Sequence, residues 1–377
     1  MRYLDHAATT KMDNEVLEVY RMASERFFGN ASSLHDFGAE ASRMLENARG
    51  VIANTLSVKG DEIYFTSGGT EANQLAVLTL LRSVKKEGKH IITTSIEHGS
   101  LHQLFKKLAV EGYSITYLGV DELGVVSLDD LREALRDETV LVAVQHVNSE
   151  IGVVQNIQEM GAFLKEKGIY FHSDLVQSYG KIQLDLRELN ITSGAISSHK
   201  IYGPKGMGAA FISEKISFTS FYPETSHEGG FRPGTVDVPS VLAFAHAAQL
   251  VCARIEVNRL HDANLRAIFV ERLSEYKDYI VFHTHKTQQV DAIIGASIVG
   301  LQGQFIMLEC NRYGFAISTG SACQVGKAEP SRMMLAMGKT NEAAKELFRI
   351  SFGQETTEQD VLDLANVLIK ILGRVAK

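Results

Sequence analysis

The sequence has few cysteines, no Cys-x-x-Cys pair and no excess of basic residues. Its three cysteines, Cys252, Cys310 and Cys323, are too few and odd in number for a disulfide framework, and they fit a reducing compartment. Without a Cys-x-x-Cys pair, neither a zinc knuckle nor a dithiol redox site is expected. The net charge of −7, from 38 basic and 45 acidic residues, argues against direct binding of nucleic acid.

The sequence also lacks the signals of membrane insertion, export and metal binding. No apolar run approaches the length of a membrane span, and residues 1–13 contain no apolar signal core, so we expect a cytoplasmic protein without a membrane partner. His98 and His102 have the i, i+4 spacing of a metal-binding pair. No Glu follows His98 as in the zincin motif, and no resident metal is expected. His283 and His285 are expected on an exposed strand.

Short β-rich runs alternate with amphipathic helical stretches through the first two thirds of the chain. The runs are residues 61–67, 90–96, 113–119, 139–147, 168–174 and 194–200, and helices are expected over 70–88 and 156–168. This alternation predicts an α/β fold with a mainly parallel sheet that helices cover on both faces.

A chain of 377 residues exceeds what one core usually supports, so two domains are expected. After about residue 238 the pattern changes to a long helical region, then to strands near 291–300 and 347–353 and a terminal helix over 357–372. We place the boundary inside the long helical region. The large domain then spans 15–249, and a smaller α+β domain comprises 1–14 and 250–377, with residues 3–10 as an extended arm beside it.

Three features of the predicted large domain could each carry chemistry, and each has a simpler structural interpretation. Gly68, Gly69 and Thr70 lie between a strand and a helix, where free N–H groups attract an anion, although a capped tight turn has the same pattern. The spacing is not that of a Walker A loop. Asp174 ends a strand, where α/β sheets bind ligands, although it could equally cap a helix.

The third feature is Lys200, which follows Ser197, Ser198 and His199 at the end of an apolar strand. A lysine among packed apolar residues is costly unless it is neutral, paired or covalently bonded, although its head could also reach water. An anion cup, a strand-end carboxylate and a strand-end lysine in one α/β domain are the parts that pyridoxal 5′-phosphate (PLP) requires. Together they predict a PLP enzyme.

Several ordered motifs resemble those of PLP-dependent cysteine desulfurases of the NifS/IscS type, in the class V aminotransferase family. They are "YLDHAATT", "FTSGGTEANQLAV", "EHGSL", "VNSEIGVVQNI", "SDLVQSYGK", "SSHKIYGPKGMGA", "RPGTVDV", "STGSACQVGKAEPS" and "FRISFG". The resemblance implies PLP fold type I with a seven-stranded sheet. It also implies a homodimer that converts L-cysteine to L-alanine. The loop around Cys323 is similar to the longer loop of one subgroup rather than to the SufS-like loop.

The resemblance implies a role for each matching residue. Lys200 forms the Schiff base with PLP, His98 stacks on the ring and moves protons, and Asp174 pairs with the ring nitrogen. Arg349 binds the substrate carboxylate, with Asn148 beside it. The remaining cofactor contacts that it implies are Gly69, Thr70, Asn148, Gln177, Ser197, His199 and, toward the phosphate of the other subunit, Thr235.

By the same resemblance, the thiolate of Cys323 takes the substrate sulfur as a persulfide and delivers it to an acceptor protein. Lys327 or His98 would assist the ionisation of the thiol, and Gly320 and Gly326 would give the loop flexibility. The acceptor would serve iron–sulfur assembly, with a transient contact at Cys323, or thiolation of tRNA or a cofactor. Cys252 and Cys310 are expected to be structural, with Cys310 half buried.

Three departures from the family pattern bear on these roles. Ser149 stands where the family has a second Asn, the stretch 224–234 is altered, and no extension follows the terminal helix. The last departure favours a tRNA-thiolation sulfurtransferase as acceptor. The alternatives are a selenocysteine lyase or aminotransferase of the same fold, or a scaffold protein that lost catalysis.

Overall fold

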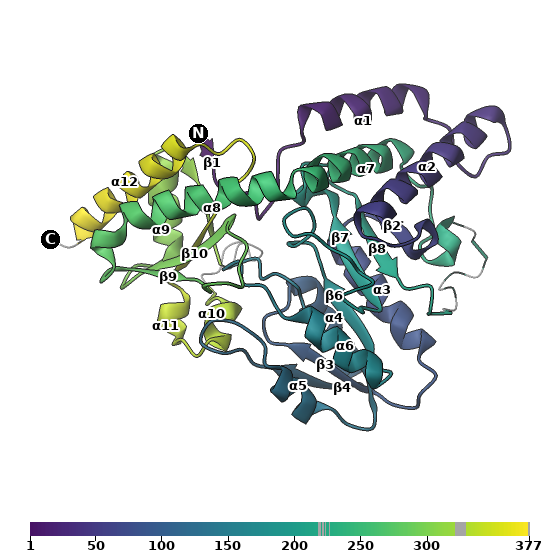
Figure 1. Ribbon diagram of the computed structural model, residues 1–377, viewed down its shortest axis with the longest axis horizontal. Coiled ribbons are helices and arrows are strands. Elements are labelled where there is room, and N and C mark those ends of the chain that lie inside the picture. Colours follow the sequence, from purple (N-terminus) through teal and green to yellow (C-terminus); the bar gives the residue numbers. More distant parts are fainter. Residues whose placement is uncertain (218–219, 221, 223, 226, 321–328, 376–377) are drawn as a thin grey trace.

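The computed structural model describes residues 1–217, 220, 222, 224–225, 227–320 and 329–375, so Cys323, Gly326 and Lys327 lie outside the described residues. Two β-sheets of different size form the frame of the molecule (Figure 1). The larger sheet has the strand order β2 (Ile63–Thr66), β8 (Gly208–Ile212), β7 (Ser193–Ser197), β6 (Tyr170–Asp174), β5 (Thr139–Ala143), β3 (His90–Thr94) and β4 (Ser114–Leu118).

This seven-stranded sheet is mainly parallel, as the strand–helix alternation predicts. Only β8 runs antiparallel to its neighbours β2 and β7. Alternate residues of the central strands face two different cores. Ile92 and Val142 belong to the core under α1 (Asn14–Arg26), α2 (Asp36–Thr55), α5 (Leu128–Ala134), α6 (Ile157–Glu166) and α7 (Val238–Ala253). Ile91 and Leu141 face α3 (Gly69–Ser83) and α4 (Gly99–Val110). Burial on both faces explains why these strands read as continuous apolar runs.

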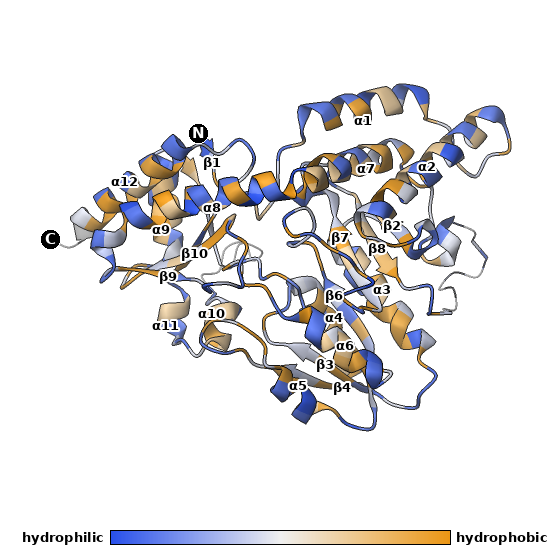
Figure 2. Ribbon diagram, viewed as in Figure 1, coloured by the Kyte–Doolittle hydropathy of each residue, from blue (hydrophilic) through white to orange (hydrophobic). Residues whose placement is uncertain are grey.

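The smaller sheet is antiparallel, with the order β12 (Ser318–Thr319), β13 (Leu347–Ser351), β10 (Ile293–Ile298) and β9 (Ile280–His283). Its core joins Phe348 to side chains of α8 (Ile255–Arg272), α9 (Gly303–Arg312) and α12 (Glu358–Val375). Figure 2 shows α8 and α12 with mixed hydrophobic and hydrophilic residues along their length, which is typical of helices that cover a core on one side. The remaining short elements are α10 (Arg332–Ala336), α11 (Asn341–Ala344), η1 (Gly60–Glu62), η2 (Ser198–Lys200), η3 (His227–Gly230) and η4 (Ser274–Tyr276).

The N-terminal arm lies beside the C-terminal part of the chain, as predicted. Strand β1 (Arg2–Tyr3) pairs in parallel with β11 (Phe315–Ala316), and Leu4 is buried in the core of the smaller sheet. The long helical region is not one helix, because it breaks at Arg254 into α7 and α8, which are bent by 66°.

Two predictions about buried residues are wrong. His283 is buried rather than exposed, and its Nε2 atom lies 2.9 Å from Ser297 Oγ across the β9–β10 pair. Cys310 is fully buried rather than half buried, because α9 turns it into the core of the smaller sheet.

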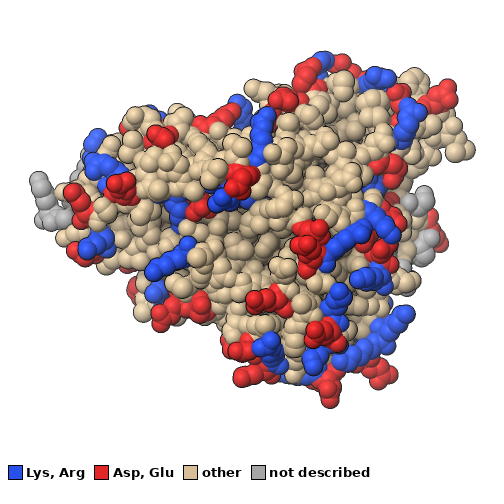
Figure 3. Space-filling view, viewed as in Figure 1, with Lys and Arg blue, Asp and Glu red and all other residues tan. Residues whose placement is uncertain are grey.

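Within the part of the chain that the structure describes, no single helix combines the length and apolar character of a membrane span. Among the described helices, only α7 and α8 together reach the length and apolar composition of a span, and the two helices are bent by 66° at their junction. On the face that Figure 3 shows, acidic and basic side chains are interspersed.

Candidate active site

The candidate site lies where β6 and β7 end beside the start of α3. Asp174 is the last residue of β6, and it is buried. Its Oδ2 atom accepts a hydrogen bond from Asn73 Nδ2 at 2.8 Å, and its Oδ1 atom accepts one from the Val176 backbone N–H at 2.9 Å. These two hydrogen bonds therefore fix the orientation of the Asp174 carboxyl group at the carboxyl end of β6.

Asn73 connects three of the polar groups beneath the site, and the sequence analysis missed it. Its amide also donates to Ser100 Oγ at 3.1 Å, and its Oδ1 atom lies 2.9 Å from His172 Nε2. Burial lowers the pKa of His172 to about 3, so the ring is neutral and donates through Nε2. The available signal was a polar residue between Ala72 and Ala76 on the buried face of α3.

His98 caps helix α4 and is tied to the same network. Its Nδ1 atom accepts from the Ser100 backbone N–H at 3.2 Å and lies 2.9 Å from Ser100 Oγ. Because Nδ1 accepts the backbone hydrogen bond, Nε2 is the ring nitrogen that carries a proton. The neighbouring Glu97 is a second residue that the sequence analysis missed. Burial raises the pKa of its carboxyl to about 8.

The start of α3 is uncapped and closely packed. Gly68, the N-cap, has a φ of 147° and supplies no side chain. A Cβ atom at Gly69 would lie 2.7 Å from Val176 Cγ2, so only glycine allows this approach. Ser197 Oγ, at the end of β7, is buried and has no hydrogen-bond partner among the described residues. Thr70 is exposed in the first turn of α3.

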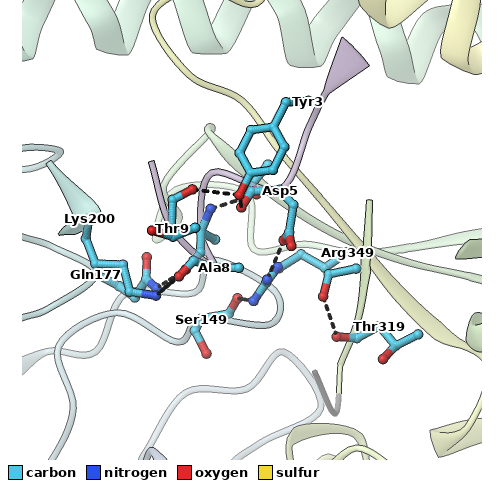
Figure 4. A network of polar contacts seen from close by, with 12 residues as sticks. Tyr3, Asp5, Ala8, Thr9, Ser149, Gln177, Lys200, Thr319 and Arg349 are labelled. Carbon is cyan, nitrogen blue, oxygen red and sulfur yellow. Dashed lines mark hydrogen bonds and ion pairs between the residues drawn. The ribbon is translucent and has the colours of Figure 1, made fainter. Parts of the chain in front are cut away.

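Lys200 contacts the N-terminal arm. Its Nζ atom donates to the carbonyl oxygens of Ala7 at 2.6 Å and Ala8 at 2.7 Å (Figure 4). Gln177 Nε2 donates to the same Ala7 carbonyl at 2.9 Å, while its Oε1 atom has no partner among the described residues. The arm thus brings Lys200 and Gln177 together.

His199 also contacts the arm, because its Nδ1 atom lies 3.0 Å from Thr9 Oγ1. Burial lowers the pKa of His199 to about 4, with further lowering from the charges of Lys200 and Lys205. At neutral pH the imidazole is therefore uncharged, and it can donate one hydrogen bond.

Arg349 lies at the opposite end of the arm, on β13. Its Nη2 atom donates to Asp5 Oδ1 at 2.7 Å and its Nη1 atom donates to the Ser149 carbonyl at 2.9 Å (Figure 4). Nε is buried without a partner among the described residues, so part of the guanidinium remains available. Asp5 lies in the "YLDHAATT" motif, but the sequence analysis did not predict a role for it.

Two predicted residues occupy unexpected positions. The side-chain oxygen of Asn148 accepts from the backbone N–H groups of Glu150 at 2.9 Å and Ile151 at 3.1 Å, so it closes a local turn. Thr235 is exposed. Its role remains a prediction.

The site combines groups that suit a phosphorylated pyridine. The uncapped start of α3 and the Ser197 hydroxyl can hold an anion, Asp174 can pair with a protonated ring nitrogen, and Lys200 supplies a primary amine. Within the described residues, no group of three or more His, Cys, Asp or Glu side chains could hold a metal ion.

Comparisons with known proteins agree with this chemistry. A family model described as aminotransferase class-V matches residues 2–364. The chain is 43% identical over 366 residues to "Putative cysteine desulfurase NifS" of Bacillus subtilis, which covers 97% of this chain and 93% of that protein. It is 36% identical over 375 residues to "Cysteine desulfurase IscS" of Dictyoglomus turgidum, covering 99% and 95%. A solved "NifS-like protein" matches with a TM-score of 0.92 at 30% identity, covering 99% of this chain and all of that one.

Proposed function

Because the chain belongs to the aminotransferase class-V family and is a PLP-dependent cysteine desulfurase, we propose that Cys323 receives the sulfur of L-cysteine as a persulfide. An acceptor protein would then take the sulfur from Cys323. The observation that carries the proposal is the convergence of Asp174, Lys200 and the uncapped start of α3 at one edge of the sheet.

The residues present fit PLP. The first turn of α3 from Gly69 and Thr70, the Ser197 hydroxyl and the neutral His199 would hold the phosphate, and Gln177 would bind the phenolic oxygen. Asp174 would pair with the ring nitrogen, and the hydrogen bonds from Asn73 and the Val176 N–H fix the orientation of its carboxyl group. When bound, PLP supplies an electron sink for the bonds at Cα of the substrate.

Lys200 and His98 would move protons at the substrate. The amine of Lys200, once released from the Ala7 and Ala8 carbonyls, would take the Cα proton of L-cysteine. The Nδ1 atom of His98 is used by the Ser100 N–H, so its Nε2 atom would serve as the proton donor and acceptor.

Arg349 would bind the carboxylate of L-cysteine. Two of its five N–H groups are used by Asp5 and Ser149, which leaves three donors, including Nε. The Ser149 carbonyl, not its side chain, holds the guanidinium. The departure from the family's second Asn therefore leaves this contact intact. Asn148 would act mainly by shaping the same turn.

In the sulfur-transfer step, the Cys323 thiolate attacks the sulfur of L-cysteine. A sulfur–sulfur bond forms and the carbon–sulfur bond breaks. The electron pair of the broken bond remains on Cβ, which takes up a proton to give L-alanine. The enzyme retains one sulfur atom as the Cys323 persulfide, so no external oxidant or reductant is needed.

We also infer a homodimer and two domains. The exposed Thr235 would complete the phosphate site of the other subunit. The break between α7 and α8 at Arg254 and the separate cores of the two sheets support a large domain over 15–249 and a small one over 1–14 and 250–377. The acceptor would be an iron–sulfur scaffold or a thiolation sulfurtransferase.

The experiment compares wild type, Cys323→Ser and the control Cys252→Ser, each loaded with PLP. Alanine and sulfide release from L-cysteine is measured with a reductant, and the persulfide is located by mass spectrometry. We expect release by wild type and by Cys252→Ser, and loss in Cys323→Ser with the yellow cofactor retained. Equal release by all three would contradict the role of Cys323 and favour a lyase.

A further inference from the structure

Gly320 and Ser331 lie on either side of residues 321–328, and both are close to the side chain of Glu150. The hydroxyl of Ser331 donates a hydrogen bond to Glu150 Oε2. A Cβ atom at Gly320 would lie 2.7 Å from the same Oε2 atom and 2.6 Å from Leu347 Cδ2. No larger residue fits at 320 without a shift. Gly320 therefore serves close packing against the carboxylate, which differs from the flexibility that the sequence suggests.

Ser331 is itself fixed within the fold. It is buried and is the N-cap of α10, where its hydroxyl accepts from the Met334 backbone N–H at 3.1 Å. Its own N–H donates to the Ala344 carbonyl at 3.0 Å. Since the hydroxyl accepts from Met334, its hydrogen is free to be donated to Glu150. The hydrogen bond thus joins the Glu150 side chain to the N-cap of α10.

The backbone of Glu150 belongs to the turn that holds Arg349. Asn148 Oδ1 accepts from the Glu150 N–H, and the preceding Ser149 carbonyl accepts from Arg349. On the other side, Glu150 lines a cavity of about 310 Å³ together with His98, Asn148, Gly320 and Ser331. Glu150 is therefore adjacent to the Arg349 turn and to both flanks of the segment with Cys323.

Two arginines, Arg349 and Arg332, act on the charge of Glu150. Burial raises the pKa of its carboxyl, while the Ser331 hydrogen bond and the charges of Arg349 and Arg332 lower it. The Oε2 atom of Glu150 accepts a hydrogen bond from the Ser331 hydroxyl and lies close to Gly320. Both residues are far from Glu150 in the sequence.

We propose that Glu150 is a positioning residue, which fixes both flanks of the segment that carries Cys323 relative to the turn that holds Arg349. The proposal rests on the proposed function, because only there does the placement of Cys323 relative to bound L-cysteine determine the reaction. Glu150 itself contacts neither substrate nor cofactor in this role.

The first test measures alkylation of Cys323 by iodoacetamide in the resting PLP enzyme, site by site with mass spectrometry. Cys252 and Cys310 serve as internal references, because burial raises the pKa of their thiols to about 11 and about 12. Loss of a hydrogen bond to a charged group should change the Cys323 rate about tenfold in Glu150→Ala and Ser331→Ala. Glu150→Gln, whose amide oxygen still accepts from Ser331, should stay near wild type.

The matched control is Thr340→Ala, which removes the N-cap of α11 without a contact to Glu150. It should leave the Cys323 rate unchanged, which separates a lost helix cap from the lost Glu150 contact. Unchanged alkylation in both Glu150→Ala and Ser331→Ala would overturn the proposal.

The second test is a single turnover with L-cysteine. In Glu150→Ala we expect the yield of Cys323 persulfide to fall about tenfold, while the L-cysteine concentration for half-maximal change of the cofactor absorbance is retained. A parallel loss of L-cysteine affinity with unchanged alkylation would show that Glu150 acts through Arg349, against the proposal. A wild type without persulfide would overturn the proposed function, and the alkylation rates would still decide the role of Glu150.

Discussion

Asn73 donates a hydrogen bond of 2.8 Å to Asp174, although 101 residues separate them in the sequence. The same amide group reaches Ser100, and its carbonyl oxygen contacts His172. One side chain on α3 therefore orients polar groups from β6 and α4. The positions of these groups thus depend on a residue that need not touch the substrate.

Asn73→Ala should weaken PLP binding and lower stability. The substitution leaves the buried atoms Asp174 Oδ2 and His172 Nε2 without their Asn73 partner, at a cost of about 1–3 kcal/mol per atom, while Asp174 Oδ1 keeps the Val176 N–H and His172 Nδ1 keeps Ser193. Binding is followed by titrating the cofactor-free protein with PLP and recording its visible absorbance. The neighbouring Gln74→Ala is the control on the same helix and should bind PLP as wild type does. Equal affinity in both variants would contradict the role of Asn73.

Arg349→Lys should raise KM for L-cysteine by about ten- to a hundredfold, since an ammonium group cannot replace the planar fork that binds a carboxylate. The contacts to Asp5 and Ser149 would also be lost in part. PLP absorbance should be unchanged, because Arg349 is not expected to contact the cofactor. Steady-state kinetics of alanine release would test this, and an unchanged KM would assign the substrate carboxylate to another group.

Arg49→Ala should destabilise the protein by about 3–5 kcal/mol, because it leaves Glu228 as an uncompensated buried charge. Arg49 Nη1 and Nη2 each donate to Glu228 at 2.8 Å, and the Phe65 N–H donates to Glu228 at 2.7 Å. This pair anchors η3, which contains Glu228, on α2. Urea unfolding measures the effect. The exposed Arg21→Ala is the control and should leave the midpoint of urea unfolding as in the wild type.

In His283→Asn, the free energy of unfolding should fall less steeply on acidification than in the wild type. Burial lowers the pKa of His283 to about 4, from 6.5, so the unfolded chain binds a proton that the folded protein excludes between these values. Stability is therefore present above pH 6.5 and is lost as the pH falls toward 4. The variant should reduce the slope by about 1.4 kcal/mol per pH unit near pH 5. Urea unfolding at several pH values tests this, with pH 8 showing the packing cost alone. An unchanged slope would mean that His283 takes up its proton in the folded state.

The amino-acid sequence by itself determined the fold class and the chemistry. Apolar runs of strand length predicted all six strands over 61–200, because burial on both faces of a parallel sheet requires continuous apolar residues. Asp174 and Lys200 could be found because the first ends β6 and the second lies in the short turn after β7, so their place at the carboxyl ends of the strands depends on local order alone. The same locality explains the recognition of the uncapped start of α3.

Only the tertiary structure decided which of these residues are connected and through what. Asn73 with Asp174, Asp5 with Arg349, and Glu150 with Ser331 are pairs separated by 101, 344 and 181 residues. Hydrogen bonds act over about 3 Å between side chains, and no periodicity in the sequence reports that distance. The burial of His283 and Cys310 was also decided there, because it depends on which neighbouring elements cover β9 and α9.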